Sequence, residues 1–216
     1  RRKMGSTLIL WFKDFLDKIG HDKAILLMHT NPKDSAGPNL EALIEELGLN
    51  EGQVLFSREK LHPENLAAMY NIVDCTINIS DAEGFGLGTL ESLSCGTPII
   101  VNMTGGLQEQ VTDGKEWFGI GLEPDSKSVV GSQEVPFIYE DRLSKESVVT
   151  ALLEMYNKTP EQRKRLGLKG LEHVKKNYNF DDFIKTWDEI FTKVHEEEGS
   201  WETRNRKQNW TLEEIT

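Results

Sequence analysis

The sequence predicts an α/β protein built on a parallel sheet that carries helices on both faces. Short apolar runs alternate with segments of helical periodicity, and the runs are continuously apolar, as in strands that are covered on both sides. The 216 residues, 38% of them hydrophobic, are enough to bury the core of one such domain. Because strands and helices take turns along the chain, we expect right-handed crossovers between the strands.

The first elements follow from caps and breakers. A helix begins after Ser6 and ends at Gly20, because apolar residues recur at helical spacing between these two caps. Alternation then continues with a strand at 24–29, a helix at 39–47, a strand at 54–56, a helix at 63–73 and a strand at 75–79. We expect these strands to lie in one sheet.

The later elements change character near residue 123. A helix begins near Leu87, and it is followed by a strand at 97–102, a short helix at 105–114 and a short strand at 118–122. Residues 123–143 show no period, which predicts a long surface loop and a candidate lid. Beyond Ser144 we expect three helices, at 145–158, 160–178 and 180–198.

Composition excludes several classes of function. The formal net charge is -11 and no basic stripe carries interleaved aromatic residues, so we expect no nucleic-acid partner. Only two cysteines occur, Cys75 and Cys95, which argues against a disulfide framework. No apolar run approaches the roughly 18 residues that cross a bilayer, so we expect no transmembrane segment and a cytoplasmic location.

The strongest functional signal is the stretch EGFGLGTLE, from Glu83 to Glu91. It follows the strand ending at Ile79, and ligands of doubly wound sheets bind outside the carboxyl ends of the strands. Its three glycines allow a ligand to approach the backbone, and the start of the following helix favours an anion such as a pyrophosphate. The spacing matches neither the dinucleotide-binding fingerprint nor a P-loop.

Glu83 and Glu91 flank this anion cradle. A carboxylate that accepts hydrogen bonds from two adjacent hydroxyls suits a sugar, so Glu91 could hold a ribose and Glu83 a transferred hexose. The spacing alone leaves an alternative open, in which Glu83 caps a helix and Glu91 is a solvated helix residue. No histidine has metal-ligand spacing with another candidate ligand, so we expect no metal site, and no residue suggests a further cofactor.

A family resemblance extends this hypothesis. The string EGFGLGTLESLSCGTPIIVNMTGGLQEQVTDG resembles the E-x7-E region of retaining GT-B glycosyltransferases of family 4, and HVKKNYNFDDFIKTW resembles their C-terminal helices. The resemblance covers nearly all of residues 3–195. It implies the C-terminal, Rossmann-like half of a GT-B fold, which binds a nucleotide-diphosphate sugar linked to UDP, GDP or ADP. A dinucleotide enzyme is not implied.

The resemblance also assigns roles to residues. It implies that Glu91 holds the ribose and that Glu83 contacts the donor sugar. The backbone between them, from Gly84, Phe85, Gly86, Leu87 and Gly88 to Thr89, then meets phosphate and sugar.

Two further positions follow from the same resemblance. Lys3 stands where the family has a lysine that neutralises the diphosphate, although a lysine so near a chain start is mobile by default. Ser57 begins the loop that surrounds the nucleotide base in the family. Arg1 and Arg2 stand too close to Lys3 to match the family's upstream arginine with confidence.

Other features are left with two readings. The turn Thr104-Gly105-Gly106 could contact the ligand or simply allow tight packing between a strand and a helix. His29 is more typical of a hydrogen-bonded residue at a strand end than of a catalytic base. For the whole chain, the alternatives to a transferase are a non-catalytic nucleotide-sugar-binding module and a nucleotide-sugar epimerase of GT-B fold.

The resemblance implies that the chain has three segments and that an N-terminal acceptor domain is missing from it. We expect residues 1–178 to form the nucleotide-sugar-binding domain, and residues 179–198 to form a helix that crosses back to an N-terminal acceptor domain absent from this chain. Residues 199–216, with Trp201 and Trp210, are expected to be a polar tail. An isolated donor-binding half should transfer sugar poorly, and any membrane association would be peripheral and made through the other domain.

Overall fold

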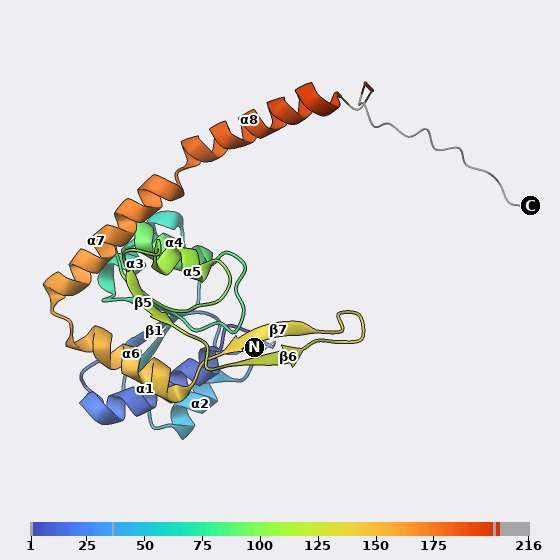
Figure 1. The fold of residues 1–216 in the computed structure, drawn as a ribbon. Helices are drawn as coiled ribbons and strands as arrows, with labels where there is room; N and C mark the ends of the chain where they lie inside the picture. The colour runs from blue at the N-terminus through green and yellow to red at the C-terminus, as the bar shows by residue number, and fades with distance from the viewer. Residues whose placement is uncertain (1, 36, 201, 204–216) are drawn as a thin grey trace, which may run out of the picture. The chain divides into compact units, whose positions relative to one another are not determined.

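The computed structural model describes residues 2–35, 37–200 and 202–203 (Figure 1). The chain divides into two compact units, Arg1–Val174 and Lys175–Thr216. Arg1, Trp201 and Trp210, which were considered above, lie outside the described residues. The expected boundary after residue 178 and the expected role of the tail stay predictions.

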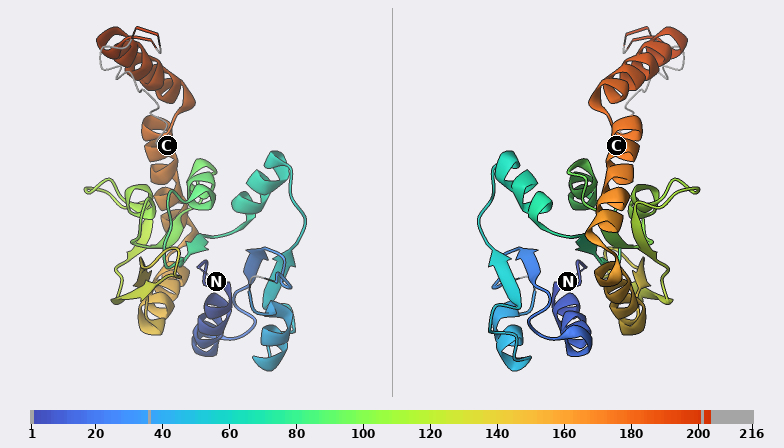
Figure 2. Two further views of the ribbon diagram at one scale, coloured as in Figure 1. Left: turned by 90° about the vertical axis from the view of Figure 1, so that its right-hand side faces the viewer. Right: turned by 90° about the vertical axis from the view of Figure 1, so that its left-hand side faces the viewer.

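Five parallel strands form the centre of the first unit. In one sheet β1 (Leu26–His29) pairs with β2 (Val54–Ser57), and in the other β4 (Ile99–Asn102) lies between β3 (Thr76–Asn78) and β5 (Gly119–Leu122). The α/β class and the position of every one of these strands are as predicted. The expected single sheet is instead divided between β1 and β3, with the strands of the two sheets on either side of the division in Figure 2.

Helices cover these sheets close to the predicted positions, although Ser6 is not the cap of the first helix, which begins at Gly5 and has no side-chain cap. They are α1 (Gly5–Ile19), α2 (Leu40–Glu46), α3 (Pro63–Ile72), α4 (Leu87–Ser94), α5 (Leu107–Val111), α6 (Lys145–Asn157) and α7 (Pro160–Asn177). The side chain of Asn39 accepts hydrogen bonds from two amides of α2, and Ser144 accepts one from α6, so both helices begin at a capping residue. The last helix of this group, α7, spans the boundary between the two units.

One hydrophobic core joins both sheets. The buried face of α1, with Ile9, Phe12 and Leu16, packs in the same cluster as Val148 and Leu152 of α6. Burial of each large aliphatic side chain stabilises the fold by about 1.5–3 kcal/mol. This shared core holds the two sheets in one unit although no backbone ladder joins them.

The prediction of a long loop at residues 123–143 is wrong. Two strands form there, β6 (Ser126–Val130) and β7 (Ile138–Arg142), and they pair as an antiparallel hairpin. Every residue of the two strands is exposed or only partly buried, and each strand contains at least three charged or hydroxyl side chains, so the segment has no continuous apolar run that would mark it as a strand. The candidate lid is therefore a hairpin with a hydrogen-bonded base.

The second unit contains α8 (Phe180–Glu198). Asn179 caps it, accepting a hydrogen bond of 2.8 Å from the Asp182 amide. A row of exposed apolar side chains runs along the helix: Phe180, Phe183, Ile184, Trp187, Phe191 and Val194. Within the described residues, no helix is both long and apolar enough to cross a membrane.

Candidate functional site

The glycine-rich loop leads from β3 into α4. Gly86 is the N-cap of α4 and has φ +87°, a left-handed conformation that glycine adopts without strain. A Cβ atom at Gly86 would stand 2.5 Å from Leu107 Cδ2. No side chain caps the helix start. Both the conformation and the packing therefore require glycine, and the first amides of α4 are left for a ligand.

The second glycine turn packs directly against this loop. The Gly106 amide donates a hydrogen bond of 2.9 Å to the Gly84 carbonyl. A Cβ at Gly105, which has φ +51°, would lie 1.6 Å from the carbonyl oxygen of Glu83. Of the two readings left open by the sequence, the structure supports tight packing for this turn, because its glycines let two loops touch backbone to backbone.

The buried side chain of Gln110 stabilises the start of α4 through two hydrogen bonds. Its side chain is fully buried; Oε1 accepts from Thr89 Oγ1 at 2.6 Å and Nε2 donates to the Phe85 carbonyl at 2.6 Å. Thr89 Oγ1 also bonds to the Gly86 carbonyl at 2.8 Å. The Thr89 hydroxyl therefore stabilises the start of α4, and the backbone of Thr89 is the part that could contact a ligand. Gln110 was missed by sequence reasoning, because a glutamine inside a short helix carries no motif.

Two cations from the N-terminal segment converge on Glu83. Lys3 Nζ forms an ion pair with Glu83 Oε2, and Arg2 Nη1 lies 3.4 Å from Oε1 and donates to the Ala82 carbonyl. The Glu83 side chain is 9% exposed, whereas that of Lys3 is 60% exposed. Burial acts to raise the pKa of the Glu83 carboxyl, but the hydrogen bond and charge of Lys3, together with Arg2, outweigh it and lower that pKa.

This pairing joins residues that the sequence could not connect. Glu83 and Lys3 are 80 positions apart, and only the resemblance placed both at one site. The structure brings them together and adds Arg2, which sequence reasoning had set aside. A flexible lysine at a chain start is thus held at the carboxyl ends of the strands.

Glu91 has a different environment, on the exposed side of α4. Its Oε2 accepts a hydrogen bond of 2.9 Å from the Tyr70 hydroxyl of α3. Burial, followed by the hydrogen bond to Glu91, raises the pKa of Tyr70 far above its usual value, so the phenol stays a donor. Tyr70 orients the carboxylate while leaving it open to solvent. Its role could not be found from the sequence, since a tyrosine in a helix gives no functional signal.

The hairpin is anchored to the loop that carries Glu83. Arg142 Nη1 pairs with Asp81 Oδ2 at 2.6 Å, and the Asp141 amide donates to the Asp81 carbonyl at 2.7 Å. Burial raises the pKa of the Asp81 carboxyl, against the opposing charge of Arg142. The side chain of Asn102 bridges the Ser80 and Asp141 carbonyls, at 2.9 Å each. These contacts fix the base of the hairpin to the end of β3.

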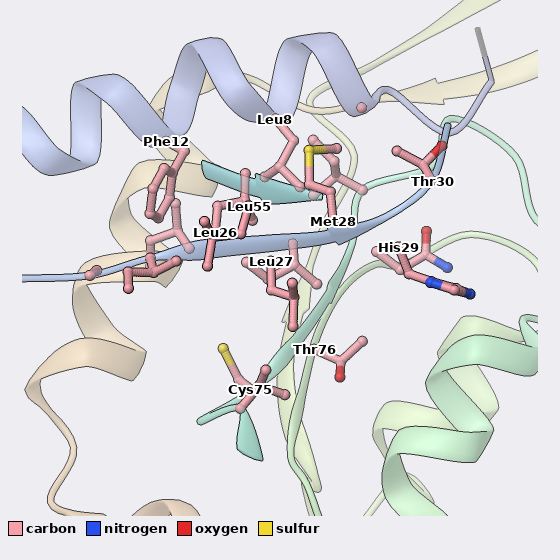
Figure 3. Close-up of a pocket in the computed structure, with 18 of the residues that line it drawn as sticks. Leu8, Phe12, Leu26, Leu27, Met28, His29, Thr30, Leu55, Cys75 and Thr76 are labelled. Carbon is pink, nitrogen blue, oxygen red and sulfur yellow. The ribbon is translucent and has the colours of Figure 1, made fainter. Parts of the chain in front are cut away.

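Several of the remaining predicted residues line one cavity. His29 Nδ1 and Ser57 Oγ are 3.0 Å apart at the ends of β1 and β2, so His29 is hydrogen-bonded as expected for a strand end. Figure 3 shows His29 and Thr30 at one end of this cavity. Phe85 and Leu87 are exposed on the glycine loop. Lys3, Gly86, Gly88 and Thr89 line the same cavity, and Ser57 is not among its lining residues.

Comparison with known proteins decides the family. The family described as "Glycosyl transferases group 1" matches residues 7–132, more than half of the chain. The chain belongs to the group 1 glycosyl transferases. The matched region includes the glycine loop, both glutamates and the braces from Tyr70 and Gln110. The cation-bearing residues Arg2 and Lys3 precede it.

A curated relative aligns with part of the chain. The chain is 32% identical over 135 residues to a D-inositol 3-phosphate glycosyltransferase of Corynebacterium urealyticum, an alignment that spans 56% of this chain and 31% of that protein. The chain thus spans about a third of the length of this curated relative.

Two solved structures share the fold. The C-terminal domain of a group 1 glycosyl transferase from Francisella tularensis superposes with a TM-score of 0.60 at 20% identity, covering 83% of this chain and 81% of that one. The TarM protein of S. aureus, solved with UDP, gives 0.66 at 16% identity, over 88% and 33%. The fold of this group 1 glycosyl transferase chain is that of the GT-B glycosyltransferases.

Proposed function

We propose that this chain is the donor-binding half of a retaining glycosyltransferase and that it binds a nucleotide-diphosphate sugar at the carboxyl ends of its strands. One observation carries the proposal. The cations of Lys3 and Arg2 meet Glu83 beside the uncapped, glycine-initiated start of α4, so positive charge and unpaired amides gather where a diphosphate would lie. The presence of UDP in the solved TarM structure, which has the same fold, supports this nucleotide class.

Each residue has a role in the proposed complex. Glu91, exposed and oriented by Tyr70, accepts hydrogen bonds from the ribose hydroxyls. The amides from Gly84 to Gly88 meet the diphosphate, and Glu83 contacts the hydroxyls of the donor sugar. For this, Lys3 must turn from Glu83 toward the phosphates, a movement that its exposed side chain allows.

The chemistry proposed for these groups is electrostatic. Negative charge develops on the departing diphosphate as the glycosidic bond breaks, and Lys3 with the first amides of α4 stabilises it. Transfer with retention needs no enzymic base opposite the anomeric carbon, so we assign no nucleophile. The acceptor and the exclusion of water are assigned to the other half of a complete transferase.

Calorimetry with UDP, GDP and ADP, each alone and as its glucose conjugate, tests the binding step. We expect one nucleotide to bind, and Glu91→Ala to weaken its binding at least tenfold. Glu64→Ala, which removes an exposed carboxylate of α3, is the matched control and should leave the affinity unchanged. Equal affinities of wild type and Glu91→Ala would contradict the ribose assignment.

The role of Lys3 has a separate readout. If Lys3 meets the diphosphate, Lys3→Ala should weaken the binding of UDP more than that of uridine monophosphate, because the second phosphate loses its partner. An equal loss of affinity for both ligands would contradict the role.

Retention is tested separately, on a protein that carries both domains. The measurement is the anomeric configuration of its product in NMR spectra.

A further inference from the structure

The segment that carries Lys3 has an unusual backbone conformation. Met4, the next residue, has φ +55°, and among the described residues it is the one position other than glycine with a positive φ. Such a conformation costs free energy and persists where neighbouring groups hold it. The helix that begins at Gly5 has no side-chain cap to hold it. The position of Lys3 therefore depends on contacts from elsewhere in the chain.

Asp81 holds the residue before Lys3. Its amide donates to the Arg2 carbonyl at 3.0 Å, and its own carbonyl accepts from the Asp141 amide of β7 at 2.7 Å. The Asp81 side chain is 5% exposed, and its Oδ2 accepts from Arg142 Nη1 at 2.6 Å. A carboxylate so deeply buried depends on such a partner. Asp81 thus joins the N-terminal segment to the β6–β7 hairpin.

Arg142 contacts the residue that follows Lys3. Its Nη1 lies 4.0 Å from Met4 Sδ, the separation of a weak hydrogen bond to sulfur. Figure 1 shows the base of the hairpin beside the start of α1, where this contact forms. Lys3 thus stands between Arg2, which is bonded to Asp81, and Met4, which touches Arg142.

The guanidinium of Arg142 is itself fixed by the hairpin. Its Nε donates to Ser128 Oγ of β6 at 2.8 Å, and Nη2 forms an ion pair with Glu140 of β7. A guanidinium presents its donors in fixed directions within one plane. Bonds to Ser128, Glu140 and Asp81 therefore determine where the group lies. A lysine or glutamine in its place could not reach all three partners at once.

We propose that Arg142 is a positioning residue: through Asp81 and Met4, the hairpin holds the backbone on both sides of Lys3 and thereby directs the ammonium group to Glu83. The effect of this placement on a diphosphate rests on the function proposed above, whereas the effect on Glu83 does not. If Arg142 only stabilised the hairpin, its loss would change the free energy of unfolding and leave the pairing of Glu83 intact.

An NMR titration of the Glu83 carboxyl in the full 216-residue chain tests the proposal. Burial raises the pKa of this carboxyl, and Lys3 with Arg2 lowers it by more, to below 4.5. Lys3→Ala measures how much of the lowering Lys3 supplies. We expect Arg142→Gln to remove at least half of that amount. Ser128→Ala, which keeps the charge of Arg142 but removes one of its partners, should raise the pKa by less.

Two controls separate position from charge. Lys127→Gln removes a cation of the same hairpin that is 71% exposed and lies 3.8 Å from Asp141, and it should leave the pKa of Glu83 unchanged. In the Lys3→Ala protein, Arg142→Gln should change that pKa little. A rise of equal size in Lys127→Gln, or in the Lys3→Ala background, would overturn the proposal, because the charge of Arg142 would then act on Glu83 directly.

An unchanged pKa of Glu83 in both Arg142→Gln and Ser128→Ala would also overturn the proposal. Amide exchange at Ile100, which is fully buried in the core, shows whether each variant keeps its fold. If Arg142→Gln does not fold, Ser128→Ala decides the question, because it removes a single hydroxyl and leaves the buried Asp81 paired.

Calorimetry of the same proteins separates this inference from the proposed function. Arg142→Gln should weaken the binding of UDP at least about threefold and that of uridine monophosphate less than about twofold, as for a displaced Lys3. If Lys3→Ala leaves the ratio of the two affinities unchanged while Arg142→Gln raises the pKa of Glu83, the diphosphate role of Lys3 fails and its positioning stands. A changed ratio in Lys3→Ala, with neither readout changed in Arg142→Gln, would overturn the positioning alone.

Discussion

Glu83, in the loop before α4, and Glu91, within α4, carry the same carboxylate, yet the protein surrounds them in opposite ways. The Glu83 side chain is 9% exposed and is paired with two cations, Lys3 and Arg2. Glu91 is exposed and accepts a hydrogen bond from the neutral hydroxyl of Tyr70. The first carboxylate is held by charge and packing, and the second by one hydrogen bond.

The contrast separates two ways of preparing a site. In the proposed complex a sugar reaches Glu83 only when Lys3 moves, so the ion pair with Lys3 would compete with the sugar. The proposed role of Glu91 needs no such rearrangement, because Glu91 is exposed and the Tyr70 hydroxyl already restricts its rotamers. We therefore expect substitutions around Glu83 to change the stability of the fold, and substitutions around Glu91 to change affinity.

The largest effect should come from the turn beneath Glu83. Gly105→Ala places a Cβ 1.6 Å from the Glu83 carbonyl at φ +51°, so the two loops must separate, and we expect a loss of about 3 kcal/mol in the free energy of unfolding. Gly114→Ala is the control, since Gly114 has φ +84° but open space around it, and strain alone costs about 1–2 kcal/mol. Urea denaturation measures both, and equal losses would contradict the packing argument.

The second largest loss of stability should come from Gln110, whose side chain bonds to Thr89 and to the Phe85 carbonyl. Gln110→Ala removes both hydrogen bonds of a fully buried side chain and leaves the Phe85 carbonyl without its donor, which we expect to cost about 2–3 kcal/mol. Gln108→Ala, in the same helix but exposed and with one bond of 3.3 Å, should cost less than about 0.5 kcal/mol. Denaturation midpoints compare them, and similar losses would show that the brace is unimportant.

The pairing of Glu83 predicts a dependence on pH. Its pKa is lowered in the folded protein, so the ionised carboxylate contributes stability that is present above its unfolded-state pKa, near 4.5, and is lost as pH falls through the folded value. Glu83→Gln should cost about 1 kcal/mol at pH 7, because both cations are largely exposed, and the difference from wild type should shrink on acidification. Thermal melting from pH 7 to pH 3 measures this.

A matched substitution serves as the control for this measurement. Glu64→Gln removes one exposed carboxylate of α3 and separates the loss of a surface charge from the loss of the Glu83 pairing. A difference between Glu83→Gln and wild type that grew at acidic pH would reverse the predicted sign.

The smallest effect should come from Tyr70, which donates a hydrogen bond to the exposed Glu91. Tyr70→Phe removes only the hydroxyl that orients Glu91, and an exposed hydrogen bond contributes about 0.5 kcal/mol, so we expect nucleotide affinity to fall about twofold. Calorimetry with the nucleotide that binds wild type measures it. In Glu91→Ala the same substitution should have no further effect on affinity, and an additive loss would show that Tyr70 acts on the ligand directly.

Local signals were enough for most of the fold. Caps such as Asn39 and Ser144, and apolar runs such as 97–102, placed every helix and parallel strand to within a few residues. The hairpin at β6 and β7 was missed because its strands are half exposed and more than half of their residues are polar. Its anchor, from Arg142 to Asp81, joins residues 61 positions apart, which no local signal could connect.

The candidate site was predictable only in part. The glycine loop and its flanking glutamates stand together in the sequence, so their spacing could be read directly. Tyr70, Gln110 and Arg2 reach the site from elsewhere in the chain, and neither a tyrosine nor a glutamine in a helix has a pattern that marks it. The roles of Glu83, Glu91 and Lys3 toward a ligand stay predictions.

The ion pair between Lys3 and Glu83 has a consequence for how the protein assembles. It closes a chain segment of 80 residues, and bringing together the ends of such a loop costs about 4 kcal/mol of chain entropy beyond a constant. A single exposed ion pair contributes far less than this. The contact can therefore form only after α1 has joined the hydrophobic core, so a spectroscopic probe at Lys3 would report the completion of folding rather than its beginning.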